Sequence, residues 1–308
     1  MQLSADSRDR YRRLCEQQGA NIPLFQQAWW LDAVCQGKEW GVLTSERAGE
    51  PVGALPFLYG RKWGIPYVLQ PQLTLFTGPW LADPTDTSTL RSLAASLIRL
   101  RFPLCMLRCA PEITDADTLH SVGFTVSPRI THRLDTLRPL PDLMAAASPL
   151  RRRDFDRITR TCTLDLSVPP TELAALHDTH FRGQGGRSWV EPSFISSVAT
   201  AAIARGHGLA AGLRDSSGRL LSATFTVFDS RCAYLLLLAR AADAPRNATA
   251  VLIWLTIQHL TPLTAAFDFE GGNTPGLARF YTSFGARPLP MLQISASHPR
   301  LLAKLLKL

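Results

Sequence analysis

Two periods of apolar residues alternate along the chain, and together they predict a mixed α/β protein. Apolar residues every three or four positions indicate helices, and short apolar or β-branched runs between turn residues indicate strands. In the first half, these patterns predict helices 4–18 and 25–35, strands 40–46, 52–59 and 65–69, helix 88–101, strand 104–109, helix 115–122 and a strand from 124 onward.

The second half of the chain predicts the same order of elements. Its expected segments are helices 171–181 and 191–204, strands 209–214, 220–228 and 232–239, helix 247–260, strand 265–269, helix 275–284 and strand 290–295. In each half, the helix before the last strand ends on a glycine, Gly123 or Gly285, where a left-handed C-cap needs no Cβ. We therefore expect two copies of one α/β unit.

Prolines and arginines mark the junction between the two copies. Pro139 and Pro141 interrupt the strand pattern, and a run of basic residues follows them. The sequence thus predicts an N-terminal domain over residues 1–140, a C-terminal domain over 141–308, and a basic helix over 143–160 at the junction.

The basic residues at this junction are candidates for binding an anion. The chain of 308 residues has a net charge of +8, and Arg151, Arg152 and Arg153 are consecutive within it. A concentrated basic patch attracts phosphorylated cofactors, nucleic acids or acidic membranes. The alternative interpretation is a solvated helix face.

Cysteines and apolar runs indicate the compartment. The six cysteines are scattered without a CxxC pair, which is typical of reduced thiols. His177 and His180 lie three residues apart with Asp178 between them, but a metal site needs a further ligand that the sequence does not indicate, so no metal is expected. The N-terminus has no apolar run after its charges, and the longest apolar stretches are too short to span a membrane. We expect a cytoplasmic protein without a transmembrane segment.

The C-terminal part of the chain resembles a known superfamily. The segments Phe267–Gly272, Gly276–Tyr281 and Phe284–Ala286 resemble the C-terminal signature of the GNAT N-acyltransferases. The repeated element order and the arginine-rich segment Ser148–Arg160 resemble the tandem-GNAT branch that contains the Fem-type peptidyltransferases. This resemblance implies two tandem GNAT-like domains, each a mixed, splayed sheet flanked by helices. We expect a degenerate N-terminal copy and a catalytic C-terminal copy, mainly because Leu119 is the counterpart of Tyr281 in the first copy.

The resemblance leaves two acyl donors open. Classical GNAT enzymes bind the pyrophosphate of acyl-coenzyme A on a glycine-rich loop, and the matching segment here, 245–250, contains no glycine. The amides of the following helix N-terminus are still suited to phosphate, with Arg246, Asn247 and Thr249 as the expected cofactor-binding residues. Fem-type enzymes lack this loop and use aminoacyl-tRNA, which is the alternative donor.

Three residues are candidates for the chemistry of acyl transfer. Glu270 follows a predicted strand at the end where such sheets open, and Asp268 lies two residues earlier on the same side. Glu270 is the expected general base for the amine; alternatively, one or both carboxylates cap the next helix. Tyr281 stands where the GNAT pattern has a tyrosine that protonates the leaving group, and the first copy has Leu119 there. The alternative for Tyr281 is packing.

Two further residues are candidates for contact with the substrate. His180 precedes the glycine-rich segment Gly183–Gly186, which in the GNAT fold borders the acceptor site, and Trp189 follows it. A surface loop is the alternative. The expected function is transfer of an acyl or aminoacyl group to an amine, with a cell-wall precursor or another small molecule as acceptor. The competing hypothesis is a non-catalytic tandem-GNAT module that binds an anionic ligand or nucleic acid.

Overall fold

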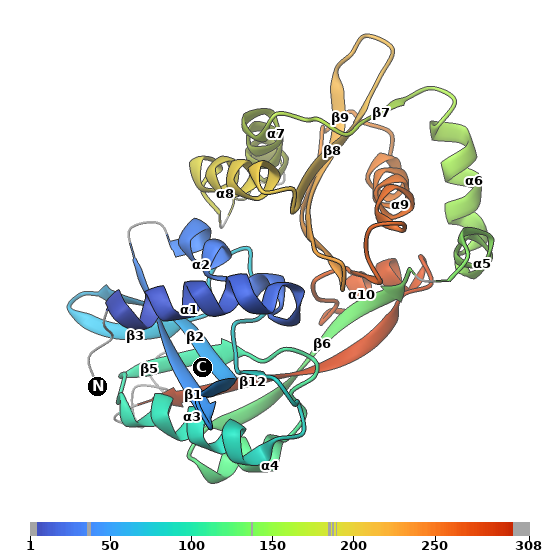
Figure 1. The fold of residues 1–308 in the computed structure, drawn as a ribbon. Coiled ribbons are helices and arrows are strands. Elements are labelled where there is room, and N and C mark those ends of the chain that lie inside the picture. The colour runs from blue at the N-terminus through green and yellow to red at the C-terminus, as the bar shows by residue number, and fades with distance from the viewer. Residues whose placement is uncertain are drawn as a thin grey trace. The chain divides into compact units, whose positions relative to one another are not determined.

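The computed structural model describes residues 5–35, 38–136, 138–183, 186, 188 and 190–297. They form two compact units (Figure 1). Unit 1 consists of the residues up to 130 together with those from 290 onward, and unit 2 consists of residues 131–289. The expected boundary near residue 140 came from the prolines and the arginine run at the junction, and it stays a prediction.

Unit 1 is a mixed sheet with helices on both faces. Its helices are α1 (Ala5–Gln18), α2 (Ala28–Cys35), α3 (Thr87–Arg99) and α4 (Ala116–Ser121), with short 3₁₀ turns at Gly19–Asn21 and Leu24–Gln26. Its strands are β1 (Glu39–Arg47), β2 (Glu50–Lys62), β3 (Ile65–Leu69), β4 (Trp80–Leu81), β5 (Leu104–Arg108) and parts of β6 (Thr125–Asp135) and β12 (Arg287–Ser297). Alternate residues of β1 and β2 pack against α1 and α2 on one face and α3 on the other.

Unit 2 has the same layered arrangement. Its helices are α5 (Leu140–Ala146), α6 (Pro149–Ile158), α7 (Pro170–Gly183), α8 (Pro192–Ala204), α9 (Ala248–Leu260) and α10 (Pro275–Thr282). Its strands are β7 (Thr163–Asp165), β8 (Gly208–Arg214), β9 (Leu220–Phe228), β10 (Ala233–Arg240) and β11 (Ala266–Asp268), with the second part of β6. Helices α7 and α8 cover one face of β8–β10, and α9 lies on the other (Figure 1).

The basic helix expected over 143–160 is two helices. Helix α5 ends at Ala146, and α6 starts at Pro149 after the N-cap Ser148, whose hydroxyl accepts from the amide of Arg151. A proline has no amide hydrogen and forces the preceding residue out of the helical region. Pro149 therefore starts a new helix instead of continuing the old one.

The parallel strand pair of unit 2 opens after a short contact. Strands β10 and β11 pair only at Ala233–Phe267 and Tyr234–Asp268. Just beyond these pairs, β10 has a bulge at Leu236 in its ladder with β9. A bulge bends the strand that carries it, so β10 turns away from β11. This is the splayed, mixed sheet that was expected.

The last strand of each half of the chain belongs to the sheet of the other half. Strand β6 pairs with β11 of the second half, and β12 pairs with β5 of the first half. In unit 1 the strand order is β1-β2-β3-β5-β12-β6, and β12 pairs with β5 from Gln293–Arg108 to Ser297–Leu104. In unit 2 the order is β6-β11-β10-β9-β8-β7, and β6 pairs with β11. Each unit thus repeats one topology, a three-stranded meander, a parallel strand and a final antiparallel strand, and borrows that final strand from the other half of the chain.

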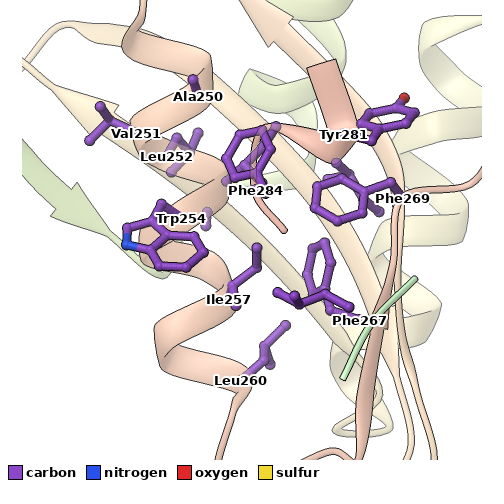
Figure 2. Close-up of a cluster of buried hydrophobic side chains, with 14 of the residues drawn as sticks. Ala250, Val251, Leu252, Trp254, Ile257, Leu260, Phe267, Phe269, Tyr281 and Phe284 are labelled. Atoms are coloured by element: carbon purple, nitrogen blue, oxygen red, sulfur yellow. The ribbon is translucent and has the colours of Figure 1, made fainter. Parts of the chain in front are cut away.

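A hydrophobic core of unit 2 lies between α9, α10 and the sheet (Figure 2). Apolar residues surround α9 on almost all sides, and β11 contributes Phe267 and Phe269. Figure 2 shows Phe284 and Tyr281 closing this core beside Phe269. Among the described residues, no helix is both long enough and apolar enough to cross a membrane.

Candidate active site

Asp268 anchors the mouth of the splay. Its side chain is 0% exposed, and its Oδ1 accepts hydrogen bonds from the Thr131 hydroxyl and, at 2.9 Å, from the Glu270 amide. The Nε of Arg133 donates to Oδ2 at 3.2 Å. Burial raises the pKa of the Asp268 carboxyl, and Arg133 and Thr131 oppose that shift. These partners belong to β6 and to the Glu270 backbone, so Asp268 does not cap α10.

The three residues after Phe269 have an unusual backbone. Glu270, Gly271 and Gly272 all have positive φ, at 53°, 126° and 105°. A glutamate in the left-handed region is uncommon and costs free energy, so surrounding contacts must hold it there. The amide of Glu270 is held by Asp268, and the amide of Gly271 donates to the Thr131 hydroxyl at 3.1 Å. The structure therefore presents the Glu270 side chain from a fixed backbone.

His132 is a member of this cluster that the sequence analysis missed. It is buried on β6, and its Nδ1 lies 2.9 Å from the carbonyl oxygen of Gly271. Because a carbonyl only accepts, Nδ1 carries the proton. Alternation along β6 is the sequence feature that bears on His132. Thr131 and Arg133 face Asp268, and His132, which lies between them in the strand, faces the opposite side. Without knowledge of the strand partner, this signal pointed to no site.

Tyr281 lies beside the same loop. Its ring centroid is 4.9 Å from that of Phe269 and 5.8 Å from that of His132, and its hydroxyl points away from the apolar core (Figure 2). Burial, followed by the nearby carboxylates of Glu270 and Asp268, raises the pKa of Tyr281 to about 12. The hydroxyl is therefore protonated at neutral pH and is able to donate a proton.

We expect Gly272→Ala to destabilise the protein by about 2 to 4 kcal/mol, because it combines backbone strain with overpacking. A Cβ at Gly272 would lie 2.1 Å from His132 Nδ1, and the backbone φ there is already +105°. Gly276→Ala is the matched control, since a Cβ at Gly276 meets nothing within 4 Å and the residue lies in α10. That change should stabilise the helix by about 0.5 to 1 kcal/mol. Chemical denaturation of both variants measures the difference, and equal stabilities would contradict the geometry of this loop.

Comparison with known proteins finds similarity in structure alone. No family model matches the sequence, and no curated protein matches it. Among solved structures, FemX is similar with a TM-score of 0.74 and 13% identity, over 100% of this chain and 99% of that chain. A tandem GNAT protein from the clavulanic acid biosynthesis pathway is similar with a TM-score of 0.59 and 16% identity, over 96% of each chain.

A third similar structure is the C-terminal domain of a putative lysylphosphatidylglycerol synthetase from Agrobacterium fabrum. It has a TM-score of 0.61 and 17% identity, over 94% of this chain and 92% of that chain. The chain has a tandem GNAT fold. The resemblance to the tandem-GNAT branch with Fem-type members is thereby confirmed at the level of fold.

The segment that corresponds to the GNAT phosphate loop leads into α9. Asn247 is the N-cap of this helix and makes no side-chain capping hydrogen bond, and Arg246 is exposed beside it. The hydroxyl of Thr249 lies 3.2 Å from that of Ser222, which ties the first turn of α9 to β9. The first amides of a helix have no partner within the helix, so this terminus suits a phosphate group.

The three consecutive arginines of α6 have different surroundings. Arg151 donates from Nε to the Ser283 hydroxyl at 2.9 Å, and its guanidinium lies 4.9 Å above the ring of Phe280. Arg152 donates to the carbonyl oxygen of Ala147 at 2.6 Å, at the end of α5. Arg153 is exposed. Two of these side chains thus have structural partners, and anion binding by the three arginines stays a prediction.

The residues expected at the acceptor side are only partly described. His180 lies on α7, where its Nδ1 is 3.1 Å from the carbonyl oxygen of Arg240 at the end of β10. It therefore lies against the strand end and not against the Asp268 cluster. Trp189 falls outside the described residues, so its expected contact with substrate stays a prediction.

In unit 1, the corresponding strand end, that of β5 at Arg108, is covered by the segment that follows β3. Gln70, just after β3, accepts from the Arg108 amide at 3.0 Å through Oε1 and donates to Thr74 through Nε2. The carbonyl oxygen of Arg108 accepts from the amides of Thr77 and Gly78 at 3.2 and 2.8 Å. Segment 70–78 thus occupies the end of β5, while the matching end of β11 leads into the Glu270 loop.

Proposed function

We propose that this chain is an N-acyltransferase whose chemistry takes place in unit 2, at the mouth of the splay. The observation that carries the proposal is the loop Glu270–Gly272, held at positive φ by Asp268 and His132 beside a protonated Tyr281. The tandem GNAT fold supports acyl transfer as the reaction, and the bonded strand end of unit 1 supports unit 2 as the working copy.

Glu270 acts as the general base in this proposal. Its carboxylate takes a proton from the acceptor ammonium, and the neutral amine attacks the carbonyl carbon of the acyl donor. The new C–N bond forms as the bond from the carbonyl carbon to the leaving sulfur or oxygen breaks. Tyr281 gives its hydroxyl proton to that leaving atom, and the proton held by Glu270 restores the tyrosine. The nitrogen of the new amide then gives its extra proton to the freed Glu270 carboxylate, which releases it to water. Asp268 and His132 position the base and do not exchange protons with substrate.

The donor is acyl-coenzyme A or aminoacyl-tRNA. The N-terminus of α9, with Arg246 and Asn247, fits a phosphate group, which both donors carry. The absence of glycine from residues 245–250 favours aminoacyl-tRNA, because close approach of the backbone to a pyrophosphate is easiest at glycine. The acceptor is an amine of a small molecule, and a cell-wall precursor is the candidate that the Fem-type resemblance implies.

The decisive assay offers the purified protein labelled acyl-coenzyme A and labelled aminoacyl-tRNA separately, each with a panel of amines. Transfer of label to an amine supports the proposal and identifies the donor. Binding of either donor without transfer to any amine would instead favour the non-catalytic module.

In this assay, Tyr281→Phe should lower kcat by about 100-fold, the low end of the usual contribution of a general acid. The variant keeps the ring that packs on Phe269, so the fold should be unchanged. Tyr59→Phe in unit 1, which removes a hydroxyl bonded to Glu39, is the control and should turn over normally. An unchanged kcat for Tyr281→Phe would exclude this tyrosine as the acid.

A further inference from the structure

The turn between β2 and β3 exposes a tryptophan almost completely. Trp63 is 87% exposed and Ile65 is 43% exposed, whereas Trp30, Trp40, Trp80 and Trp254 are buried. An isolated exposed aliphatic residue is ordinary, but an indole placed wholly in water at the tip of a hairpin is not.

The backbone at this position makes a tryptophan costly. Trp63 and Gly64 have φ of +53° and +79°, and Lys62 pairs with Ile65 across them, which is a two-residue type I′ hairpin turn. Asparagine or aspartate followed by glycine is the favoured pair in such a turn, since a bulky side chain is strained at positive φ. The tryptophan therefore opposes turn stability and makes little compensating contact with the fold.

One cation lies over the indole and a second is close to it in sequence, and the surrounding segment of sequence lacks carboxylates. Lys62 Nζ lies 4.9 Å from the centre of the Trp63 ring, and Arg61 is exposed beside it. Residues 51–82 contain no aspartate or glutamate. The tip thus combines an apolar ring with two positive charges, and no acid of this segment neutralises them.

The hairpin reaches beyond the strand next to it. Pairing of β1 with β2 stops at Glu39–Tyr59, while β2 and β3 continue to pair from Tyr59–Val68 to Lys62–Ile65 (Figure 1). The Tyr67 ring covers Gly60 across the ladder, where a Cβ would lie 2.8 Å from the tyrosine hydroxyl. This cross-strand cover stiffens the projecting hairpin and holds Trp63 outward.

We propose that this tip, residues 61–65, docks on the surface of an anionic lipid bilayer. Tryptophan favours the interface between headgroups and acyl chains, and adjacent lysine and arginine are attracted by anionic lipids. Binding of single-stranded nucleic acid is less well supported, since it uses several stacking aromatics along a basic groove and this tip has one. The proposal does not depend on the acyltransfer chemistry of unit 2.

Co-sedimentation of the full chain with vesicles tests the proposal. We expect binding to vesicles of equal parts phosphatidylcholine and phosphatidylglycerol, weakened by salt, and much less binding to pure phosphatidylcholine. Trp63→Asn should lower the partition coefficient by at least about tenfold, from the loss of buried aromatic area. Arg61→Gln and Lys62→Gln should each lower it by about fivefold.

Trp63→Asn also separates docking from folding. Asparagine suits a type I′ turn, so this variant should unfold at a higher temperature than the wild type while losing vesicle binding. Leu263→Asn, at another exposed apolar position, is the control and should leave binding unchanged. The proposal is overturned if Trp63→Asn sediments like the wild type, or if the wild type does not bind anionic vesicles. Trp63-dependent binding of single-stranded RNA without vesicle binding would also overturn it.

Discussion

Glu270→Gln should slow acyl transfer by about 10²- to 10⁴-fold, which is the usual contribution of a general base. Glutamine has nearly the same shape and adopts the same left-handed backbone, but it cannot take a proton from the acceptor ammonium. The backbone hydrogen bond from residue 270 to Asp268 does not involve the side chain and should persist. Steady-state kinetics with the donor identified above measure the effect, and donor binding should change little.

Two controls make this result specific. Glu50→Gln changes an exposed glutamate at the start of β2 and should retain full activity. The activity of Glu270→Gln should also rise as pH approaches the pKa of the acceptor ammonium, because the amine then loses its proton without a protein base. Full activity in the Glu270→Gln, Tyr281→Phe double variant would end the catalytic assignment, and the non-catalytic module would then be the better hypothesis.

Asp268→Ala should destabilise the protein by about 3 to 5 kcal/mol, the range observed when one partner of a buried ion pair is removed. The change leaves three donors, from Thr131, Arg133 and the Glu270 amide, without their acceptor and opens a cavity. Chemical denaturation gives the loss in free energy of unfolding. Acyl transfer should also be lost, because the backbone that presents Glu270 is released.

An exposed ion pair provides the comparison for Asp268. Asp243 receives a hydrogen bond from Arg219 at 2.6 Å, and both side chains are exposed, so Asp243→Ala should unfold close to the wild type. If Asp268→Ala proved as stable as Asp243→Ala, the Asp268 cluster would not anchor the loop as described. If it lost stability but kept full activity, Glu270 would not depend on this anchor.

Periodicity predicted most elements because each unit is built from ordinary amphipathic segments. The expected strand 65–69 coincides with β3, and the expected helices 4–18 and 88–101 differ from α1 and α3 by one or two residues at their ends. The glycines expected to end α4 and α10 have φ of 109° and 89°, so their left-handed conformation is confirmed. The short strands β4 and β7 were missed, because two or three residues contain no measurable period.

Features that depend on distant pairing were not predictable in this way. Alternation along β6 shows that it is a strand but does not show that Asp268 lies opposite Arg133. The role of His132 follows only from that register. Glu270 and Tyr281 became candidates because they lie in the motif that resembles the GNAT signature, and their roles stay predictions. The closure of the β5 strand end by Gln70 has no such motif.

The placement of β12 between β5 and β6 has a consequence for synthesis on the ribosome. Domains usually fold in the order in which they emerge, with the N-terminal one first. Here the sheet of unit 1 lacks an interior strand until residues 290–297 have been made, although its other strands emerge earliest. Every strand of the unit 2 sheet, by contrast, has been made once residue 268 has been added. Unit 2 is thus the first unit that is able to complete its sheet. Strands β5 and β6 are translated earlier, but one edge of each stays unpaired until β12 has been made.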